Sequence, residues 1–293
     1  MEEKIKAIEF PGKEFKSKED LFMTLKQHKD RIITLKKAHI YKSFEKGGVS
    51  GVDISPSEGV IKAIDGARDG FIYPIISTTR YIDSHKDCHF DGCFNRTLQN
   101  QQGKVVYALD HKLEFDSILA WEKDVVMSVQ NIDWSLVGKD YEGKTQALIF
   151  EINKDSIRRK DVLKDIEDKA SEFENSIRMV YHKILLGIDS NKKELQEEKS
   201  YFDSKINQIA NKDIALDDGY FWGVEELGIS KEGSLVVAGG SNDATAIFQK
   251  DNGEPVLDTS SQSFDSSSDT QNGNEPTKVT HKESIINFYK HLK

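Results

Sequence analysis

The alternation of apolar and polar positions divides the chain into a helical beginning, a β-rich middle and a polar end. Between Leu21 and Leu35 apolar residues recur at helical spacing, and Ser17 with Asp20 forms a typical helix start. A helix is therefore expected from residue 17 to about residue 38, within a leader of residues 1–45. Residues 46–70 are rich in Gly, Ser and charge, which indicates a linker.

From residue 71 onward, short apolar or alternating runs predict strands. They begin with "FIYPIIST" and "KVVYALDH" and continue through "DVVMSVQNIDW", "TQALIFEI", "NSIRMVYHKI", "YFWGVEELGI" and "SLVVAG". Two helices are expected between them, "VLKDIEDKASEF" and "KKELQEEKSYFDSKINQIANK". The pattern predicts one α+β domain over residues 71–248.

The end of the chain has a different composition. Residues 255–277 contain six serines, four acidic residues and no Lys or Arg, so they cannot bury enough apolar surface to fold. Residues 249–293 are therefore expected to form a flexible tail, which ends in a short amphipathic segment, "HKESIINFYKHLK".

Composition narrows the function classes. A net charge of −9 argues against a general nucleic-acid binder, which would need a basic face. The chain has no apolar run of membrane-spanning length, no secretory leader and only two cysteines. Together these features indicate a soluble protein of a reducing cytoplasm, with no membrane partner.

Ser176 and His111 are the candidate catalytic residues. Ser176 begins an apolar strand, and a serine nucleophile needs a base within hydrogen-bond reach. His182 lies on the same strand face, but six residues of strand span about 20 Å, which is too far. His111 ends "VVYALDH", where the chain turns polar, and catalytic groups often lie at strand ends. From these residues alone, a hydroxyl at a strand edge and a histidine capping a strand are the favoured explanations of the two positions.

A second constellation, "HKDCHFDGC", contains His85, Cys88, His89 and Cys93. These residue types are zinc ligands, but their spacing is not one of the standard patterns, and acidic residues lie between them. An acidic turn is the alternative explanation. We expect no metal and no cofactor.

Taken in order, four segments resemble the prohead (capsid maturation) proteases of tailed phages and prophages, serine proteases distantly related in fold to the herpesvirus assemblins. The segments are "TRYIDSHKDCHFDGCFNRTL", "VVYALDHKLEFDSILAW", "NSIRMVYHKI" and "KEGSLVVAGGSNDATAI". The resemblance covers roughly residues 71–248, and the candidate histidine precedes the candidate serine by 65 residues, in the family's order. It implies an α+β domain with an assemblin-like β-barrel core, closed or nearly closed, and surrounding helices.

The resemblance also implies roles for individual residues. His111 would be the general base, Ser176 the nucleophile and Glu232 the third member, with Glu225 and Glu226 as rivals. Ile177 stands where similar segments more often have glycine, so the source of the oxyanion hole stays open. Backbone N–H groups near Gly239 and Gly240, or the side chain of Arg178, could supply it.

The implied function is a serine endopeptidase that cleaves capsid and scaffold proteins during virion assembly, inside a procapsid in the bacterial cytoplasm. Its partners would be the major capsid protein and scaffold segments, and its own chain is a further expected substrate. Whether it forms an oligomer within the procapsid stays open. The alternative is a non-catalytic assembly module of the same fold, in which Ser176 is idle.

Overall fold

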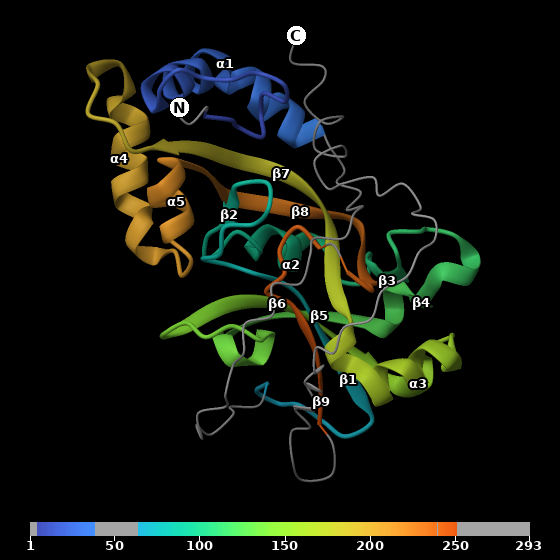
Figure 1. Ribbon diagram of the computed structural model, residues 1–293. Coiled ribbons are helices and arrows are strands. Elements are labelled where there is room, and N and C mark those ends of the chain that lie inside the picture. Colours follow the sequence, from blue (N-terminus) through green and yellow to red (C-terminus); the bar gives the residue numbers. More distant parts are fainter. Residues whose placement is uncertain (1–4, 39–63, 239, 251–293) are drawn as a thin grey trace, which may run out of the picture.

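Two β-sheets form the framework of the protein (Figure 1). The computed structural model describes residues 5–38, 64–238 and 240–250. The first sheet is antiparallel and has the order β5 (Val125–Asp133), β6 (Lys144–Asn153), β1 (Phe71–Thr78) and β9 (Ala246–Gln249). Its strands are rich in β-branched and aromatic residues, which suit a pleated, buried surface.

The second sheet is built around one long strand, β8 (Tyr220–Val236). Strand β7 (Glu174–Ile188) pairs with β8 antiparallel along almost all of its length. On the other side of β8, β2 (Asp87–His89) pairs parallel with the first half, and β3 (Val106–Leu109) pairs parallel with the second half. Strand β4 (Ile118–Ala120) pairs antiparallel with β3. Most of the predicted strands are thus present, but "YFWGVEELGI" and "SLVVAG" are parts of one strand.

The fold is mixed α and β, as expected, but the described residues do not form a closed barrel. Closure would need a continuous hydrogen-bond ladder between the two sheets. Where β7 approaches β9, side chains make the contacts: the Asn175 amide donates to the Ala246 carbonyl at 2.8 Å, and the Asn175 backbone N–H donates to Thr245 Oγ1 at 3.0 Å. Because side chains replace the ladder there, the two sheets remain separate.

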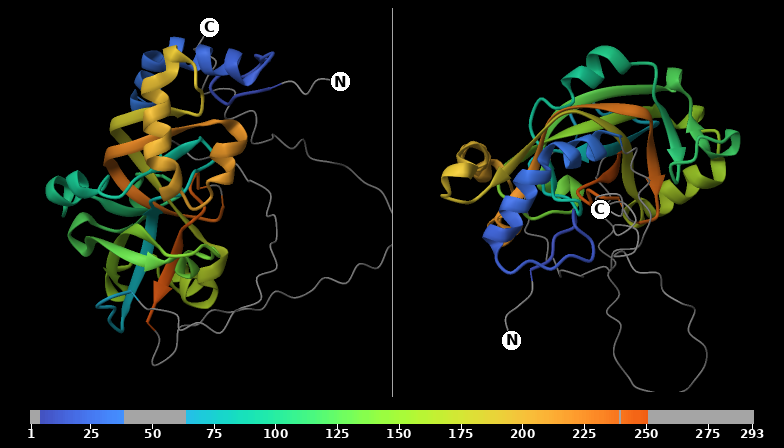
Figure 2. Two further views of the ribbon diagram at one scale, coloured as in Figure 1. Left: turned by 90° about the vertical axis from the view of Figure 1, so that its left-hand side faces the viewer. Right: turned by 90° about the horizontal axis from the view of Figure 1, so that it is seen from above.

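The helices cover the ends and outer faces of the sheets (Figure 2). Helix α1 (Lys18–Ala38) agrees with the sequence prediction and lies over β7. Helix α3 (Lys160–Lys169) begins two residues before its predicted start and is followed by a 3-10 turn. The single helix predicted over residues 192–212 is wrong in extent, because α4 (Gln196–Lys205) ends in a 3-10 turn and α5 (Asp213–Asp218) begins later. Helix α2 (Asn95–Gln101) was not expected.

The N-terminal segment shares the core of the β-rich region. Leu25 and Ile32 of α1 are fully buried against residues of β7 and β8. The buried Lys36 ammonium lies 2.5 Å from the Asp87 carboxylate of β2. The Glu9 carboxylate, equally buried, accepts hydrogen bonds from the Tyr220 hydroxyl and the Trp222 indole N–H. The described part of the leader is thus packed into the domain and is not a separate unit.

Two expected segments fall largely outside the described residues: most of the linker, residues 46–63, and the tail from residue 251. Within the described ranges, no helix combines the length and apolar character needed to cross a lipid bilayer.

Candidate active site

His111 lies in an unusual turn at the end of β3. The strand ends at Leu109, so the prediction that the strand runs to His111 is wrong by two residues. The Asp110 N–H donates to the Leu235 carbonyl of β8 at 3.0 Å, and Asp110 and His111 then adopt left-handed backbone angles, with φ of 48° and 57°. This conformation costs roughly 1–2 kcal/mol per non-glycine residue, so other contacts must hold it.

Glu232 is the carboxylate that meets His111. It lies on β8 beside the start of β3 and is fully buried. Its Oε1 atom is 2.8 Å from His111 Nδ1. A carboxylate can only accept, so this contact assigns the ring proton to Nδ1 and leaves Nε2 as the basic nitrogen. The acid suggested by the resemblance is therefore in place to orient the imidazole.

Ser234 completes the support of this pair and was not singled out from the sequence. Its Oγ donates to Glu232 Oε2 at 2.5 Å and accepts from the His111 backbone N–H at 3.2 Å. One hydroxyl thus links the orienting acid to the main chain of the candidate base. Its spacing of two residues from Glu232 puts both side chains on one strand face, but that spacing alone does not distinguish it from other serines.

Ser176 lies on the same face of the sheet as this cluster. In the β7–β8 ladder it is directly opposite Ser234, so their Cα atoms are about 5 Å apart and their side chains project to one side. Glu232 projects to that side as well, because it is two residues before Ser234. The fold thus brings His111 and Glu232 into contact and sets Ser176 beside Ser234. Ser234 in turn bonds to both His111 and Glu232.

Arg178 also reaches this cluster from β7. Its Nη2 donates to the His111 carbonyl at 2.7 Å, and its Nε lies 3.4 Å from Glu232 Oε1. Ladder pairing shifts just after Ile177, where Met179 pairs with Ile229, so Arg178 lies in an irregular stretch of β7. Such irregularities often redirect a side chain beside a functional site.

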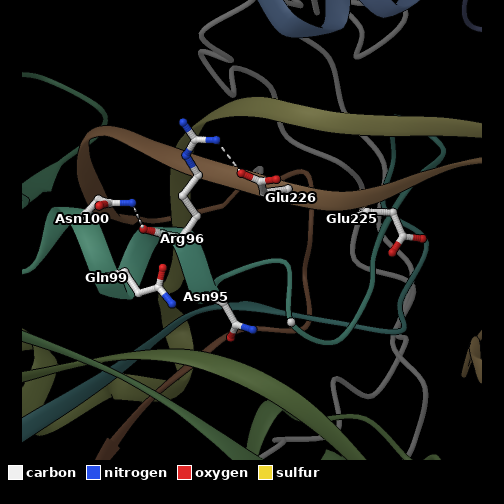
Figure 3. Close-up of a pocket in the computed structure, with 7 residues that line it drawn as sticks. Asn95, Arg96, Gln99, Asn100, Glu225 and Glu226 are labelled. Atoms are coloured by element: carbon white, nitrogen blue, oxygen red, sulfur yellow. Dashed lines mark hydrogen bonds and ion pairs between the residues drawn. The ribbon is translucent and has the colours of Figure 1, made fainter.

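The rival acids are engaged elsewhere. Glu225 accepts from the Tyr201 hydroxyl at 2.6 Å and pairs with Lys205 at 3.0 Å. Glu226 pairs with Arg96 of α2 at 2.6 Å, a contact marked by a dashed line in Figure 3. Both line a hollow of about 460 Å³ between α2 and β8, and its lining includes neither His111, Ser176 nor Glu232. Among the three predicted candidates, Glu232 alone contacts His111 in the described structure.

His182, which strand geometry excluded as a base for Ser176, also lies near this hollow. Its ring stands directly over Gly228, in the same part of β8 as Glu226. Partial burial and the positive charge of Arg96 lower its pKa. His182 therefore lies near Glu226, six residues along β8 from Glu232, which agrees with its exclusion from the candidate site.

The segment suggested as a zinc site has a different arrangement. Across the described ranges, no group of three or more His, Cys, Asp or Glu side chains is placed to hold a metal ion. Cys88 and Cys93 are free, fully buried thiols whose pKa values burial raises well above the ordinary value, whereas thiolates are the zinc ligands. The thiols pack in apolar clusters of the core.

His89 lies beside a serine, a contact that the sequence did not indicate. Its Nδ1 lies 3.2 Å from Ser77 Oγ, and both side chains are almost completely buried. Burial lowers the pKa of His89 to about 4, so its ring resists taking up a proton near neutral pH. A buried pair that resists protonation suits a structural role, not nucleophilic catalysis.

The described groups suggested as oxyanion donors already donate to other acceptors. Gly239 lies outside the described residues. The Gly240 N–H donates to Glu174 Oε2 at 3.1 Å, and Arg178 directs Nη2 at His111. Both described candidates therefore have acceptors within the protein.

Comparison with known proteins finds no matching family model, no matching curated protein and no matching solved structure. The function has to be argued from the chain itself.

Proposed function

We propose that this protein is a serine endopeptidase that cleaves capsid and scaffold proteins during phage head maturation. The observation that carries the proposal is the contact of His111 Nδ1 with the buried Glu232 carboxylate, on the sheet face that bears Ser176. Nucleophile, base and orienting acid are the three parts that a serine protease needs. The phage context rests on the resemblance of the four sequence segments, in their order.

The reaction follows from the assigned tautomer. His111 Nε2 takes the proton of Ser176 Oγ as the oxygen bonds to the carbonyl carbon of the scissile peptide. Glu232 stabilises the imidazolium that results, through Nδ1. The C–N bond breaks as His111 returns the proton to the leaving amine, which leaves an acyl-enzyme at Ser176. Water, deprotonated by His111, then releases the new carboxylate and restores the hydroxyl.

Burial favours one alternative, an assembly module of the same fold without activity. Ser176 has 7% and His111 has 6% of its surface exposed, which leaves a substrate little access unless the surrounding segments move. In that case the site would be a structural cluster, and the chain would act by binding capsid or scaffold proteins.

One experiment separates the two. Full-length protein and its Ser176→Ala variant are expressed, followed by mass spectrometry for self-shortening, and treated with a fluorophosphonate probe that labels activated serines. The matched control is Ser77→Ala, which removes the buried hydroxyl beside His89. We expect shortening and labelling in the wild type and in Ser77→Ala, and neither in Ser176→Ala. Unlabelled wild-type protein that binds capsid protein without cutting it would establish the assembly module instead.

A further inference from the structure

The His111 backbone is held on both sides of the residue. Its N–H donates to Ser234 Oγ, and its carbonyl accepts from Arg178 Nη2 at 2.7 Å. Both partners also approach Glu232: Ser234 Oγ bonds to Oε2, and Arg178 Nε lies 3.4 Å from Oε1. The base, its acid and the two groups that hold the turn therefore form one connected network.

The left-handed turn explains why such support is needed. Two successive non-glycine residues, Asp110 and His111, have positive φ angles. Each would relax toward the favoured right-handed or extended regions if it were not restrained. Relaxation would rotate the imidazole away from Glu232, because the side-chain direction follows the backbone angles. The hydrogen bond from Arg178 to the His111 carbonyl opposes that rotation directly.

The environment of Arg178 indicates that this placement is specific. Its side chain is only 12% exposed, and its Nε is buried without a hydrogen bond although it faces Glu232 at ion-pair distance. Burying a guanidinium is costly unless a carboxylate compensates it. Glu232 is the fully buried carboxylate that does so, while the planar guanidinium reaches the His111 carbonyl with a second nitrogen.

We propose that Arg178 is a positioning residue: it fixes the left-handed turn at His111 so that the imidazole presents Nδ1 to Glu232 and Nε2 toward Ser176. The proposal rests on the proposed function for its catalytic consequence, but not for the geometry itself. It assigns to Arg178 a different task from the oxyanion role that the sequence suggested, because the guanidinium bonds to the enzyme's own carbonyl. Ser234 performs the corresponding task at the His111 N–H.

The test uses full-length protein and two readouts. In the first, the ¹⁵N chemical shifts of the His111 ring report which nitrogen carries the proton, and this measurement needs no activity. Wild-type protein is expected to show the Nδ1–H tautomer. Arg178→Met is expected to show a mixture, and Arg178→Lys, which keeps the charge and one donor, is expected to recover most of the wild-type signal. The matched control is Arg96→Met, which breaks the pair between Arg96 of α2 and Glu226 of β8, the strand that also carries Glu232, and is expected to leave the ring unchanged.

In the second readout, cleavage of a supplied peptide is measured. Arg178→Met is expected to lower kcat about 10²-fold with KM changed less than about twofold, since a misplacement of about 1 Å costs that much. An oxyanion donor would lower kcat too, but would leave the tautomer as in wild type, and that result overturns the proposal. If Arg178→Met does not fold, Arg178→Lys and Ser234→Ala carry the same comparison. If Arg178→Met shows the mixed tautomer while the wild-type protein cuts nothing, the proposed function is refuted and the positioning role stands.

Discussion

The carboxyl group of Glu232 leads to the most direct prediction for a single residue. In Glu232→Gln the amide can present its NH₂ group to His111, which favours the wrong ring tautomer, while the shape of the side chain is kept. We expect kcat for a supplied peptide to fall about 10⁴-fold, the loss seen when the orienting acid of a serine protease is removed. Steady-state kinetics measure this loss.

Glu225→Gln is the matched control for that experiment, since Glu225 lies on the same strand but bonds to Tyr201 and Lys205. Its kcat should stay within about twofold of wild type. Equal losses from both variants would remove Glu232 from the triad.

Asp83 allows a prediction about pH at the residue scale. Burial, reinforced by the charge of Asp87, raises the pKa of Asp83 from its ordinary 3.8 to about 8. The folded protein therefore binds a proton that the unfolded chain has released between about pH 4 and pH 8. The stability contributed by the protonated group is complete below about pH 4 and is lost as the pH rises toward 8.

Asp83→Asn should remove this dependence. The amide oxygen can still accept the backbone N–H groups of His85 and Asp87, so the hydrogen bonds of Oδ1 are kept. Urea unfolding at a series of pH values should show a wild-type stability that falls with pH by up to about 1.4 kcal/mol per unit, and a flatter curve for the variant. Parallel curves for the two proteins would show that Asp83 is already ionised throughout this range.

Individual residues of the site were predictable only in part. The resemblance named both His111 and Glu232, and the structure brings them into contact. Ser234 could not be recognised, because its role depends on the parallel pairing of β3 with β8. Ser234 lies 123 residues after His111 in the chain. The local pattern "GSLVV" shows an apolar strand and gives no reason to single out its hydroxyl. The left-handed angles at His111 likewise have no sequence signal, because neither Asp110 nor His111 is glycine.

At the scale of elements, strand β8 depends on a close approach at Gly233. A Cβ atom there would lie 2.8 Å from the Phe150 ring of β6 and 3.2 Å from Ile76 of β1. Because Glu232 and Ser234 flank this glycine, displacement of the strand would move both groups that support His111. Gly233→Ala should therefore lose about 1–3 kcal/mol of stability from overpacking and also lose activity. Thermal or urea unfolding and peptide cleavage measure the two effects.

Gly228→Ala is the control on the same strand. Its added Cβ would lie 2.9 Å from the end of the half-buried His182 ring, which can rotate aside, and at a looser 3.3 Å from the Gln101 side-chain oxygen. This variant should keep both its stability and its kcat close to wild type. If Gly233→Ala behaves in the same way, the approach of the two sheets at this point is looser than the described packing.

Most strands could be predicted from sequence, but their pairing could not. The apolar runs at residues 71–78 and 145–152 correspond closely to β1 and β6, because β-branched side chains suit buried strands. The expected barrel does not close, since the contact between β7 and β9 depends on the Asn175 side chain, a tertiary detail that periodicity does not contain. The helix predicted over residues 192–212 is interrupted by a 3-10 turn after Lys205. Its largely polar sequence does not indicate where the helix ends.

For the whole molecule, the prediction concerns the tail. The last strand, β9, ends at Gln249, so truncation after residue 250 removes no described element. The truncated protein should fold and cut a supplied peptide as wild type does. Its incorporation into assembling procapsids should fall, if the apolar end of the tail docks on scaffold or shell, and quantitative blotting of purified particles measures this.

A shorter deletion makes the test of the tail sharper. Removing residues 281–293 takes away only "HKESIINFYKHLK" and keeps the serine-rich stretch. It should reduce incorporation as much as the full truncation does. Equal incorporation of all three proteins would show a passive extension, and a truncated protein that fails to fold would show that the domain boundary is wrong.

The central position of β8 in its sheet determines when the candidate site can form during synthesis. This strand is made late, yet it is the partner of β2, β3 and β7, and His111 meets its acid across 121 residues of chain. Parallel partners so distant in sequence form slowly, since a long loop must close before any contact stabilises it. During synthesis Ser176, His111 and Glu232 cannot come together until almost the whole domain has been made. For the proposed protease, whose early activity would destroy the shell that it matures, the delay between translation and activity would be protective. In refolding experiments the His111 ring signal should accordingly appear in the slowest phase, after the antiparallel sheet has formed.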